Sequence, residues 1–256
     1  MRGQANPPLP RLHRVIGRAL ARHCARRLAI LPEDFKPTVS FTFDDFPASA
    51  LSAALPILQA TGMTATWYAT SGLLGKSSAV GTVATAGQLR GLQEAGHEIG
   101  CHTHGHLDGR KVPAEAYGRD IDENHRVLME LVPGLAIRSF AYPFGGVTVG
   151  AKRAAMTRAV TCRSTMAGIA RGHVDLALLP ANPLYEETLD AAQDVIGRLS
   201  QAGGWAIFYT HDVAEAPSPW GCTPATFAAI TAAVARAGLR VGTVGAVADQ
   251  ILRRLA

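Results

Sequence analysis

From residue 37 onward, short runs of β-branched and aromatic residues alternate with longer segments rich in Ala, Leu, Gln and Glu. The short runs are typical of strands and the longer segments of helices. A β–α alternation repeated about seven times predicts parallel strands joined by helical crossovers. The expected strands are TVSFTF (38–43), MTATWYAT (63–70), HEIGCHT (97–103), IRSFAYP (137–143), AVTCRST (159–165), LALLPA (176–181), WAIFYTH (205–211) and LRVGTVG (239–245).

Two architectures fit this alternation, an open doubly wound sheet and a closed β/α barrel. No G-x-G-x-x-G motif follows the first expected strand, which removes the main sign of a dinucleotide-binding sheet. Barrels build their active sites at the carboxyl ends of their strands, so we expect one distorted or incomplete (β/α) barrel of about seven parallel strands, with its active site on that rim. The polar groups at these strand ends are Asp44-Asp45, His102 to His106, Pro143 to Gly145, and His211.

The positive charge of the chain is concentrated at its N-terminus. Seven of the 25 basic residues are arginines within residues 1–30, which contain no acidic residue, and the rest of the chain has 18 basic against 20 acidic residues. We therefore expect a basic N-terminal arm over residues 1–36 and a single domain over residues 37–256. A nucleic-acid binder carries its charge on a folded face, so no nucleic-acid partner is expected.

The arm places Leu12, Val15, Ile16, Ala19 and Leu20 at helical spacing between arginines. The simplest interpretation is a helix packed on the body of the protein. A basic amphipathic helix in peripheral contact with an anionic membrane is an alternative, and an organelle transit peptide is another. The apolar run LAIL is too short for a secretory signal, so the expected location is cytoplasmic.

The four cysteines give no sign of a disulfide framework. Cys24, Cys101, Cys162 and Cys222 are widely scattered, and no C-x-x-C pair occurs. Disulfide frameworks belong mainly to short secreted chains, so we expect free thiols.

Two adjacent carboxylates, Asp44 and Asp45, end the first apolar strand. One carboxylate can ligate a metal while its neighbour accepts a proton from water. The alternative is a helix N-cap, because aspartate is a preferred cap and a helix is expected near Pro47. A cap accounts for one aspartate but not for both.

Three of the nine histidines lie within residues 102–106. His102 and His106 have the i, i+4 spacing that brings two imidazoles to one face of a helical turn, a common metal-binding arrangement. A carboxylate from the first strand would complete a site of two histidines and one aspartate. His104 should point away from this site. His and Asp ligands suit Zn²⁺, with Co²⁺ or Ni²⁺ as alternatives.

A further histidine, His211, follows the apolar run IFYT into a polar loop. Imidazole titrates near neutral pH and can protonate a leaving amine. The alternative is a structural histidine bonded to a backbone carbonyl. In the same loop, Trp220 either stacks on a sugar or packs within the loop.

The segments TFDD, HTHGH, FAYPFG and YTHD, in this order at strand ends, resemble the motifs of the NodB-homology polysaccharide deacetylases, carbohydrate esterase family 4. The resemblance covers about residues 38 to 250 and implies a metal-dependent hydrolase that removes acetyl groups from sugars, chiefly N-acetylglucosamine polymers. It makes Asp44 the catalytic base and Asp45 a metal ligand. The family's H-[ST]-x-x-H motif falls on His102, Thr103 and His106, which implies that both histidines are ligands.

The later motifs imply the remaining roles. His211 would be the general acid, and Phe144 would offer its backbone N–H to the oxyanion. The acetyl methyl would occupy an apolar pocket near Phe208 and Tyr209. The neighbouring substrate-binding positions are Tyr142 and Pro143.

Two family motifs are altered in this chain. Many members have an arginine two residues before the third-motif proline, paired with the catalytic aspartate, where this chain has Ala141. Arg138 and Arg163 are the nearest candidates to replace that arginine. The fourth motif, an acidic residue with a tryptophan, is not recognisable, and Asp175 is the best substitute.

Three hypotheses about function follow from these observations. The first is a deacetylase of an N-acetylated carbohydrate. The second keeps the chemistry but takes a lipid-linked amino sugar or another amide, which the basic arm would suit. The third is a silent carbohydrate-binding relative, because the third and fourth motifs are altered. The sequence predicts no oligomeric state.

Overall fold

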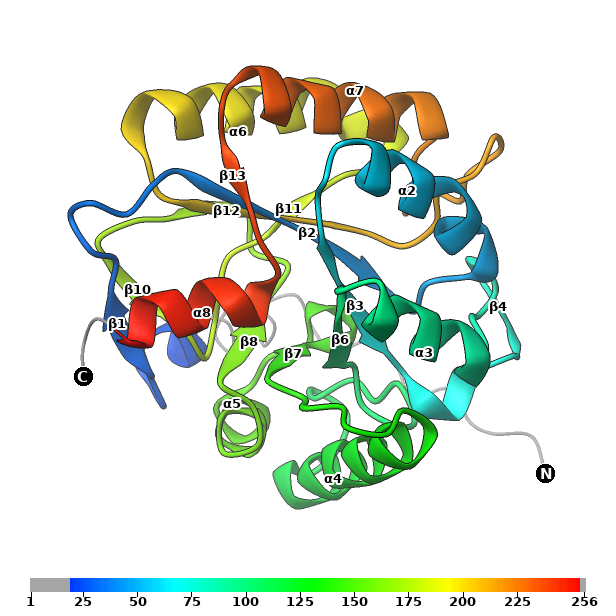
Figure 1. Cartoon of the computed structure of the whole chain (residues 1–256). Helices are drawn as coiled ribbons and strands as arrows, with labels where there is room; N and C mark the ends of the chain where they lie inside the picture. Colours follow the sequence, from blue (N-terminus) through cyan, green and yellow to red (C-terminus); the bar gives the residue numbers. More distant parts are fainter. Residues whose placement is uncertain (1–18, 254–256) are drawn as a thin grey trace.

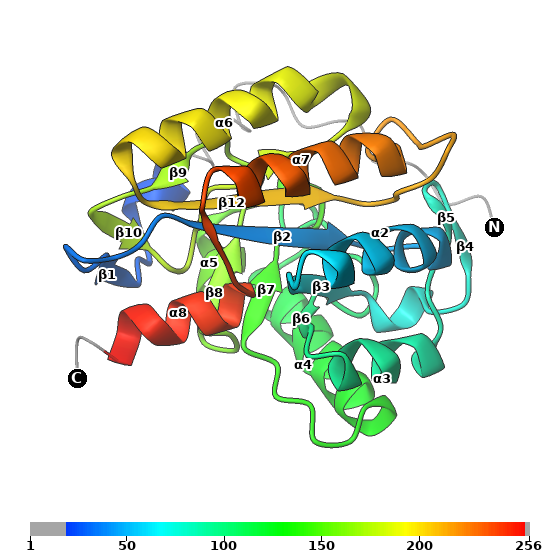
Figure 2. The ribbon, with the colours of Figure 1, turned by 45° about the horizontal axis from the view of Figure 1, so that its top comes forward.

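The computed structural model of the chain describes residues 19–253. Within these residues, seven parallel strands form one hydrogen-bonded path. Figure 2 shows β12, β2 and β3 side by side, with their arrows pointing the same way. In spatial order the strands are β11 (Asn182–Pro183), β12 (Trp205–Thr210), β2 (Thr38–Asp44), β3 (Ala65–Ala69), β6 (Glu98–Cys101), β7 (Ser139–Ala141) and β8 (Thr161–Arg163).

The segment that precedes β11 joins the two ends of this path. The Leu179 N–H donates to the carbonyl of Cys162, and the Leu179 carbonyl accepts from the Ser164 N–H, both at 2.8 Å. Three residues later, Asn182 pairs with Phe208 of β12. The sheet therefore closes on itself as a distorted barrel.

Helices cover the outside of the strands. In Figure 1, α6 and α7 lie above the strands, α2 and α3 to their right, and α4 and α5 below them. Strands inside and helices outside confirm the predicted (β/α) barrel of about seven parallel strands. The helices are α2 (Ala48–Ala60), α3 (Ala86–Glu94), α4 (Ala114–Leu131), α5 (Val149–Met156), α6 (Leu189–Ala202), α7 (Pro224–Arg236) and α8 (Val244–Arg253).

Short elements complete the fold. The expected strand at 239–245 is only two residues long, because α8 already begins at Val244. The expected strand at 176–181 likewise reduces to a bridge at Leu179 followed by β11. The short elements are β1 (Leu28–Ile30), β4 (Ser77–Ser78), β5 (Gly81–Thr82), β9 (Ile169–Ala170), β10 (His173–Asp175), β13 (Arg240–Val241), η1 (Ser71–Leu73), η2 (Pro143–Gly145) and η3 (Glu186–Thr188).

Strand β2 shows how the sequence builds the two faces of the barrel wall. Its polar and apolar residues alternate, yet the whole strand is buried. Val39, Phe41 and Phe43 pack in the outer core with residues of the surrounding helices. Ser40 and Thr42 lie on the opposite face and donate hydrogen bonds to backbone carbonyls. The inner face of this strand is therefore polar, and its last inward residue is an aspartate at the rim.

The barrel also buries a carboxyl group deeper inside, that of Glu98 on β6. Its Oε2 accepts hydrogen bonds from Thr66 Oγ1 and from the Gly245 N–H, each at 2.8 Å. Burial raises the pKa of Glu98 because the carboxylate loses its water, and the hydrogen bonds oppose this only in part. The ionised form of Glu98 is therefore disfavoured in the folded protein.

We expect Glu98→Gln to raise the free energy of unfolding at pH 8 by about 1 kcal/mol, because glutamine removes the cost of ionising this buried carboxyl group. The raised pKa means that the folded state loses stability as the pH rises from the ordinary glutamate value through the raised one. Glutamine does not titrate and keeps an acceptor for the Gly245 N–H. Urea unfolding should show the gain at pH 8 and a much smaller one at pH 5. A loss of stability at both pH values would contradict this expectation.

The described part of the N-terminal arm packs against the barrel. Residues 19–23 are helical, and Ala21 is buried. Lys152 on α5 is fully buried, donates hydrogen bonds to the carbonyls of Ala21 and Cys24, and pairs with Asp175 at 2.5 Å. A buried ammonium group needs such partners. This segment is therefore joined to the body by polar anchors as well as by apolar contact.

Most of the N-terminal arm cannot be compared with its prediction, whereas the cysteines can. Residues 1–18, with most of the expected amphipathic helix, lie outside the described residues, and the boundary at residue 36 stays a prediction. Across residues 19–253, no helix is both long enough and apolar enough to cross a membrane. The four cysteines are free, as predicted.

Candidate active site

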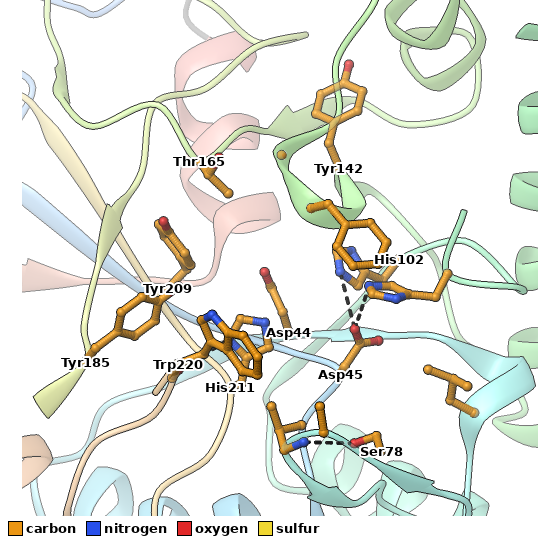
Figure 3. Close-up of a pocket in the computed structure, with 16 residues that line it drawn as sticks. Asp44, Asp45, Ser78, His102, Tyr142, Thr165, Tyr185, Tyr209, His211 and Trp220 are labelled. Carbon is orange, nitrogen blue, oxygen red and sulfur yellow. Dashed lines mark hydrogen bonds and ion pairs between the residues drawn. The ribbon is translucent and has the colours of Figure 1, made fainter. Parts of the chain in front are cut away.

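A cavity of about 510 Å³ opens at the carboxyl ends of the parallel strands, the rim where the sequence places the active site. This volume is typical of small-molecule sites. Figure 3 shows Asp45 and His102 on one side, aromatic rings and His211 on the other, and Asp44 between them. The lining residues are Asp44, Asp45, Leu73, Ser78, Ala79, Val80, His102, His106, Tyr142, Phe144, Gly145, Thr165, Tyr185, Tyr209, His211 and Trp220.

Asp45 leaves β2 in a left-handed backbone conformation, with a φ of 43°. Such conformations are uncommon outside glycine and concentrate at functional sites. One carboxylate oxygen accepts from Thr70 Oγ1 at 2.6 Å, and the other faces the histidines. The next helix, α2, has Pro47 as its N-cap and no side-chain capping bond. The alternative role of these aspartates as a helix cap is therefore excluded.

Asp45, His102 and His106 form a cluster whose potential ligand atoms all lie within 4.8 Å of one another. The Oδ2 atom of Asp45 is 2.7 Å from His106 Nε2 and 3.8 Å from His102 Nε2. These are the three residues that the sequence predicts as ligands. Two imidazoles and one carboxylate leave further coordination positions open toward the cavity.

The state of His102 fits a metal ligand. Its Nδ1 donates a hydrogen bond to the carbonyl of Ala141 at 2.8 Å, so the lone pair of Nε2 faces Asp45 and His106. Burial lowers the pKa of His102 and outweighs the opposing effect of the nearby aspartates. The cluster offers two imidazole nitrogens and a carboxylate oxygen, which is the donor set of a divalent metal site.

The loop from His102 to His106 does not form the helical turn that the i, i+4 spacing suggests. Thr103 and His106 both have left-handed backbone conformations, with φ values of 64° and 52°. Thr103 Oγ1 accepts from the Leu107 N–H at 3.0 Å and holds this tight turn. His104 points away from the cluster and bonds Ser71 Oγ through Nδ1 at 2.8 Å, as predicted.

Asp44 is held by Arg163, which comes from β8 on the far side of the barrel. The Arg163 guanidinium contacts both carboxylate oxygens of Asp44 at 2.5 Å. Arg163 is fully buried, and the rings of Tyr68 and Tyr209 lie 5.2 and 5.0 Å from its charged carbon. Burial alone would raise the pKa of Asp44, but Arg163, with His102 and His211, lowers it overall. Asp44 is therefore ionised at neutral pH.

The other two candidates for the altered motifs lie away from the cavity. Arg138 pairs with Asp249 on α8 at the surface. Asp175 binds Lys152 and the Arg27 N–H beside the N-terminal ends of the strands. The sequence alone cannot decide which arginine lies beside Asp44, because the separation of two residues along the chain does not show which strand ends meet in the fold. The interpretation of Asp175 as a substitute for the acidic residue of the fourth motif was wrong.

We expect Arg163→Met to move the acid limb of the activity profile to higher pH and to lower kcat/KM at neutral pH at least about tenfold. Without the arginine, burial raises the pKa of Asp44, so the carboxylate becomes protonated at a pH where the wild type is still ionised. Measured pH–rate profiles check this. Arg138→Met is the matched control and should keep the wild-type profile. If Arg138→Met moved the limb instead, Arg163 would not be the partner of Asp44.

His211 lies across the cavity from the Asp45–His102–His106 cluster, directly after the end of β12. Its Nδ1 donates to the carbonyl of Trp220 at 3.3 Å, which leaves Nε2 as the free ring nitrogen. The ring of Tyr185 is 6.4 Å from the imidazole, and so is that of Trp220. The Trp220 side chain is 45% exposed and lines the cavity. His211 is therefore bonded to a backbone carbonyl, that of Trp220, and also lines the cavity.

Neighbouring residues of β12 point in opposite directions. Tyr209 lines the cavity, whereas Phe208 stacks on Phe41 in the outer core, 6.0 Å between ring centres. Of the two residues expected beside the apolar pocket, only Tyr209 therefore lines the cavity. The alternation of side chains along a strand permits only one of two adjacent residues on the inner face.

The turn η2 forms the upper edge of the cavity. Pro143 begins it, and Phe144 has a left-handed backbone with a φ of 57°. The Phe144 ring is 60% exposed and lies 4.4 Å from the ring of His106. Tyr142 is buried, and its hydroxyl donates to the Ala177 carbonyl, away from the cavity (Figure 3). Phe144 is therefore the residue of this turn that a ligand in the cavity would contact.

Comparison with protein families identifies the class of this site. Residues 33–161, half of the chain, match the family model described as polysaccharide deacetylase. The chain belongs to the polysaccharide deacetylase family. This confirms the resemblance seen in the sequence. The match contains Asp44, Asp45, His102 and His106, but it ends before Arg163 and His211.

Solved structures of similar fold agree with this family. An acetyl xylan esterase from Clostridium thermocellum, of carbohydrate esterase family 4 and in complex with cobalt, is 20% identical, with 83% of this chain and 90% of that chain covered and a TM-score of 0.59. A family 4 carbohydrate esterase from Streptomyces lividans is 16% identical, with 80% and 91% covered and a TM-score of 0.54. A family 4 pseudoenzyme from Bacillus anthracis is 14% identical, with 84% and 66% covered and a TM-score of 0.54. No curated protein sequence matches the chain.

Several residues that line the cavity were not singled out from the sequence. Thr165 and Tyr185 follow the ends of β8 and β11, so a search of every strand end would have found both. Ser78 at the end of β4 and residues 79–80 of the turn to β5 also line the cavity. No sequence signal indicates that role, because the segment is short and chemically plain.

Proposed function

We propose that this chain is a metal-dependent hydrolase that removes N-acetyl groups from N-acetylglucosamine-containing oligo- or polysaccharides. The observation that carries the proposal is the pairing of an ionised, arginine-held Asp44 with an Asp45–His102–His106 cluster in one cavity. Membership of the deacetylase family supports the reaction class. Zinc is the proposed metal, with cobalt or nickel as alternatives, because imidazole and carboxylate ligands suit all three.

Each residue then has a chemical role. A divalent cation held by the cluster would act as a Lewis acid that polarises the acetyl carbonyl. Asp44 accepts a proton from the attacking water, and the Phe144 N–H donates to the developing oxyanion. His211 donates a proton to the departing nitrogen, so that acetate and a free amine leave. The aromatic wall of Tyr185 and Trp220 offers stacking surfaces for a sugar ring.

The test is acetate release by the zinc-loaded protein from N-acetylglucosamine oligomers of two to six units. O-acetylated xylan and an acetylated lipid-linked amino sugar serve as comparison substrates, and Asp44→Asn serves as the blank. We expect release from the oligomers to be the fastest. Faster release from either comparison substrate would contradict the proposed substrate class.

A further inference from the structure

Asp212, the residue after the proposed general acid, is buried and organises the loop that follows it. Its Oδ1 accepts from Ser218 Oγ at 2.6 Å, and its Oδ2 accepts from the Ser218 N–H at 2.7 Å. The Asp212 carbonyl also accepts from the Cys222 N–H at 3.1 Å. One aspartate therefore closes residues 212–222 into a compact loop.

The closure is tight at Gly221. A Cβ atom at this position would lie 2.3 Å from Asp212 Oδ1 and 2.5 Å from the Asp212 carbonyl oxygen. Side chains cannot approach that closely, so the loop reaches its closed path only with glycine there. Asp212 and Gly221 thus fix the backbone on either side of Trp220.

The Trp220 carbonyl is the point where this loop meets the catalytic histidine. It accepts from the backbone N–H of His211 at 3.1 Å, from His211 Nδ1 at 3.3 Å and from Thr210 Oγ1 at 3.4 Å. The acceptor on Nδ1 is a neutral backbone oxygen, which no side-chain rotation can move. The direction of His211 Nε2 therefore depends on the path of the loop.

We propose that Asp212 is a positioning residue: by clamping Ser218 it holds the Trp220 carbonyl where that carbonyl orients His211 for proton donation. The inference rests on the proposed function, because it assigns His211 the role of general acid. The Trp220 ring lines the cavity while its carbonyl holds the histidine. Trp220 thus lines the substrate cavity with its ring and contacts the proposed general acid, His211, through its carbonyl.

Two substrates that differ in their leaving group can distinguish this role from a merely structural one. An amide nitrogen needs a proton to depart, whereas 4-nitrophenolate leaves without one. We expect Asp212→Ala to lower kcat for an N-acetylglucosamine oligomer about 10- to 100-fold, as misplacement of a catalytic group does. With 4-nitrophenyl acetate, the same variant should stay within about threefold of the wild type, since no general acid is required.

Two further variants keep the test decisive. Ser218→Ala removes one of the two clamp contacts and should give the same selective loss at smaller size, in case Asp212→Ala does not fold. Trp220→Ala keeps the carbonyl and loses the ring, so it should raise KM for the oligomer about tenfold with little change in kcat. Asp122→Asn, whose carboxylate pairs with Arg158 at the surface, is the control and should match the wild type on both substrates.

The outcomes are distinguishable. Loss on the oligomer with retention on the aryl acetate supports the proposal. Parallel loss on both substrates would mean that Asp212 only maintains the fold, and unchanged oligomer kinetics in Asp212→Ala and Ser218→Ala would mean that the clamp does not orient His211. A wild-type protein inactive on both substrates would instead overturn the proposed function.

Discussion

We expect Asp44→Asn to bind its metal as tightly as the wild type and to release acetate at least about 100-fold more slowly. Asparagine has the shape of aspartate and still offers an oxygen to Arg163, so the site should keep its geometry. It cannot accept a proton from water at neutral pH. Asp44 is not part of the proposed metal site, which consists of Asp45, His102 and His106. Turnover and metal affinity should therefore separate in this variant.

The measurement is metal content and zinc affinity beside kcat on an N-acetylglucosamine oligomer. Asp44→Glu is a useful companion variant, because it keeps the negative charge but moves the carboxylate oxygens. Full activity of Asp44→Asn would show that another group is the base. Loss of metal together with activity would show that Asp44 is a ligand.

The second large effect concerns the three proposed metal ligands. We expect Asp45→Ala and His106→Ala each to weaken zinc binding about 100-fold or more and to abolish turnover, since a three-ligand site loses a third of its donors. His106 Nε2 and Asp45 Oδ2 lie 2.7 Å apart and face the same point. Neither variant should lose the barrel, because both residues lie at its rim.

His104→Ala is the matched control for this series. The residue is in the same loop, but its imidazole bonds Ser71 and does not face the cluster. Zinc affinity in this variant should stay within about threefold of the wild type. Titration of zinc into the stripped proteins measures all three variants. A large loss in His104→Ala, with His106→Ala unaffected, would mean that the wrong histidine pair has been assigned.

The barrel and most of its rim could be predicted from the sequence. Strand and helix periods are local, and the carboxyl ends of parallel strands must share one rim, so Asp44, His102 and His211 could be brought together without coordinates. Short or irregular segments were less predictable. The strand expected at 239–245 gave way after two residues to α8, whose Val244 N–H bonds Thr66 Oγ1.

The support around the site was harder to predict, because it depends on contacts between distant strands. Arg163 and Asp44 are 119 residues apart and meet only because β8 and β2 face each other across the barrel. No local pattern separates Arg163 from Arg138. The sequence predicted which residues of the His102–His106 turn face the site, but it did not predict the backbone conformation of the turn. The left-handed conformations of Thr103 and His106 have no recognisable sequence signal.

We propose that the Asp45–His102–His106 cluster and Asp44 act together in metal-dependent deacetylation. The most direct test is acetate release from an N-acetylglucosamine oligomer by metal-stripped protein, before and after addition of Zn²⁺ or Co²⁺. We expect no release from the stripped protein, restored release on addition of either metal, and none from Asp44→Asn under the same conditions. Stoichiometric metal binding without release would contradict the claim, and so would release that persists after the metal is removed.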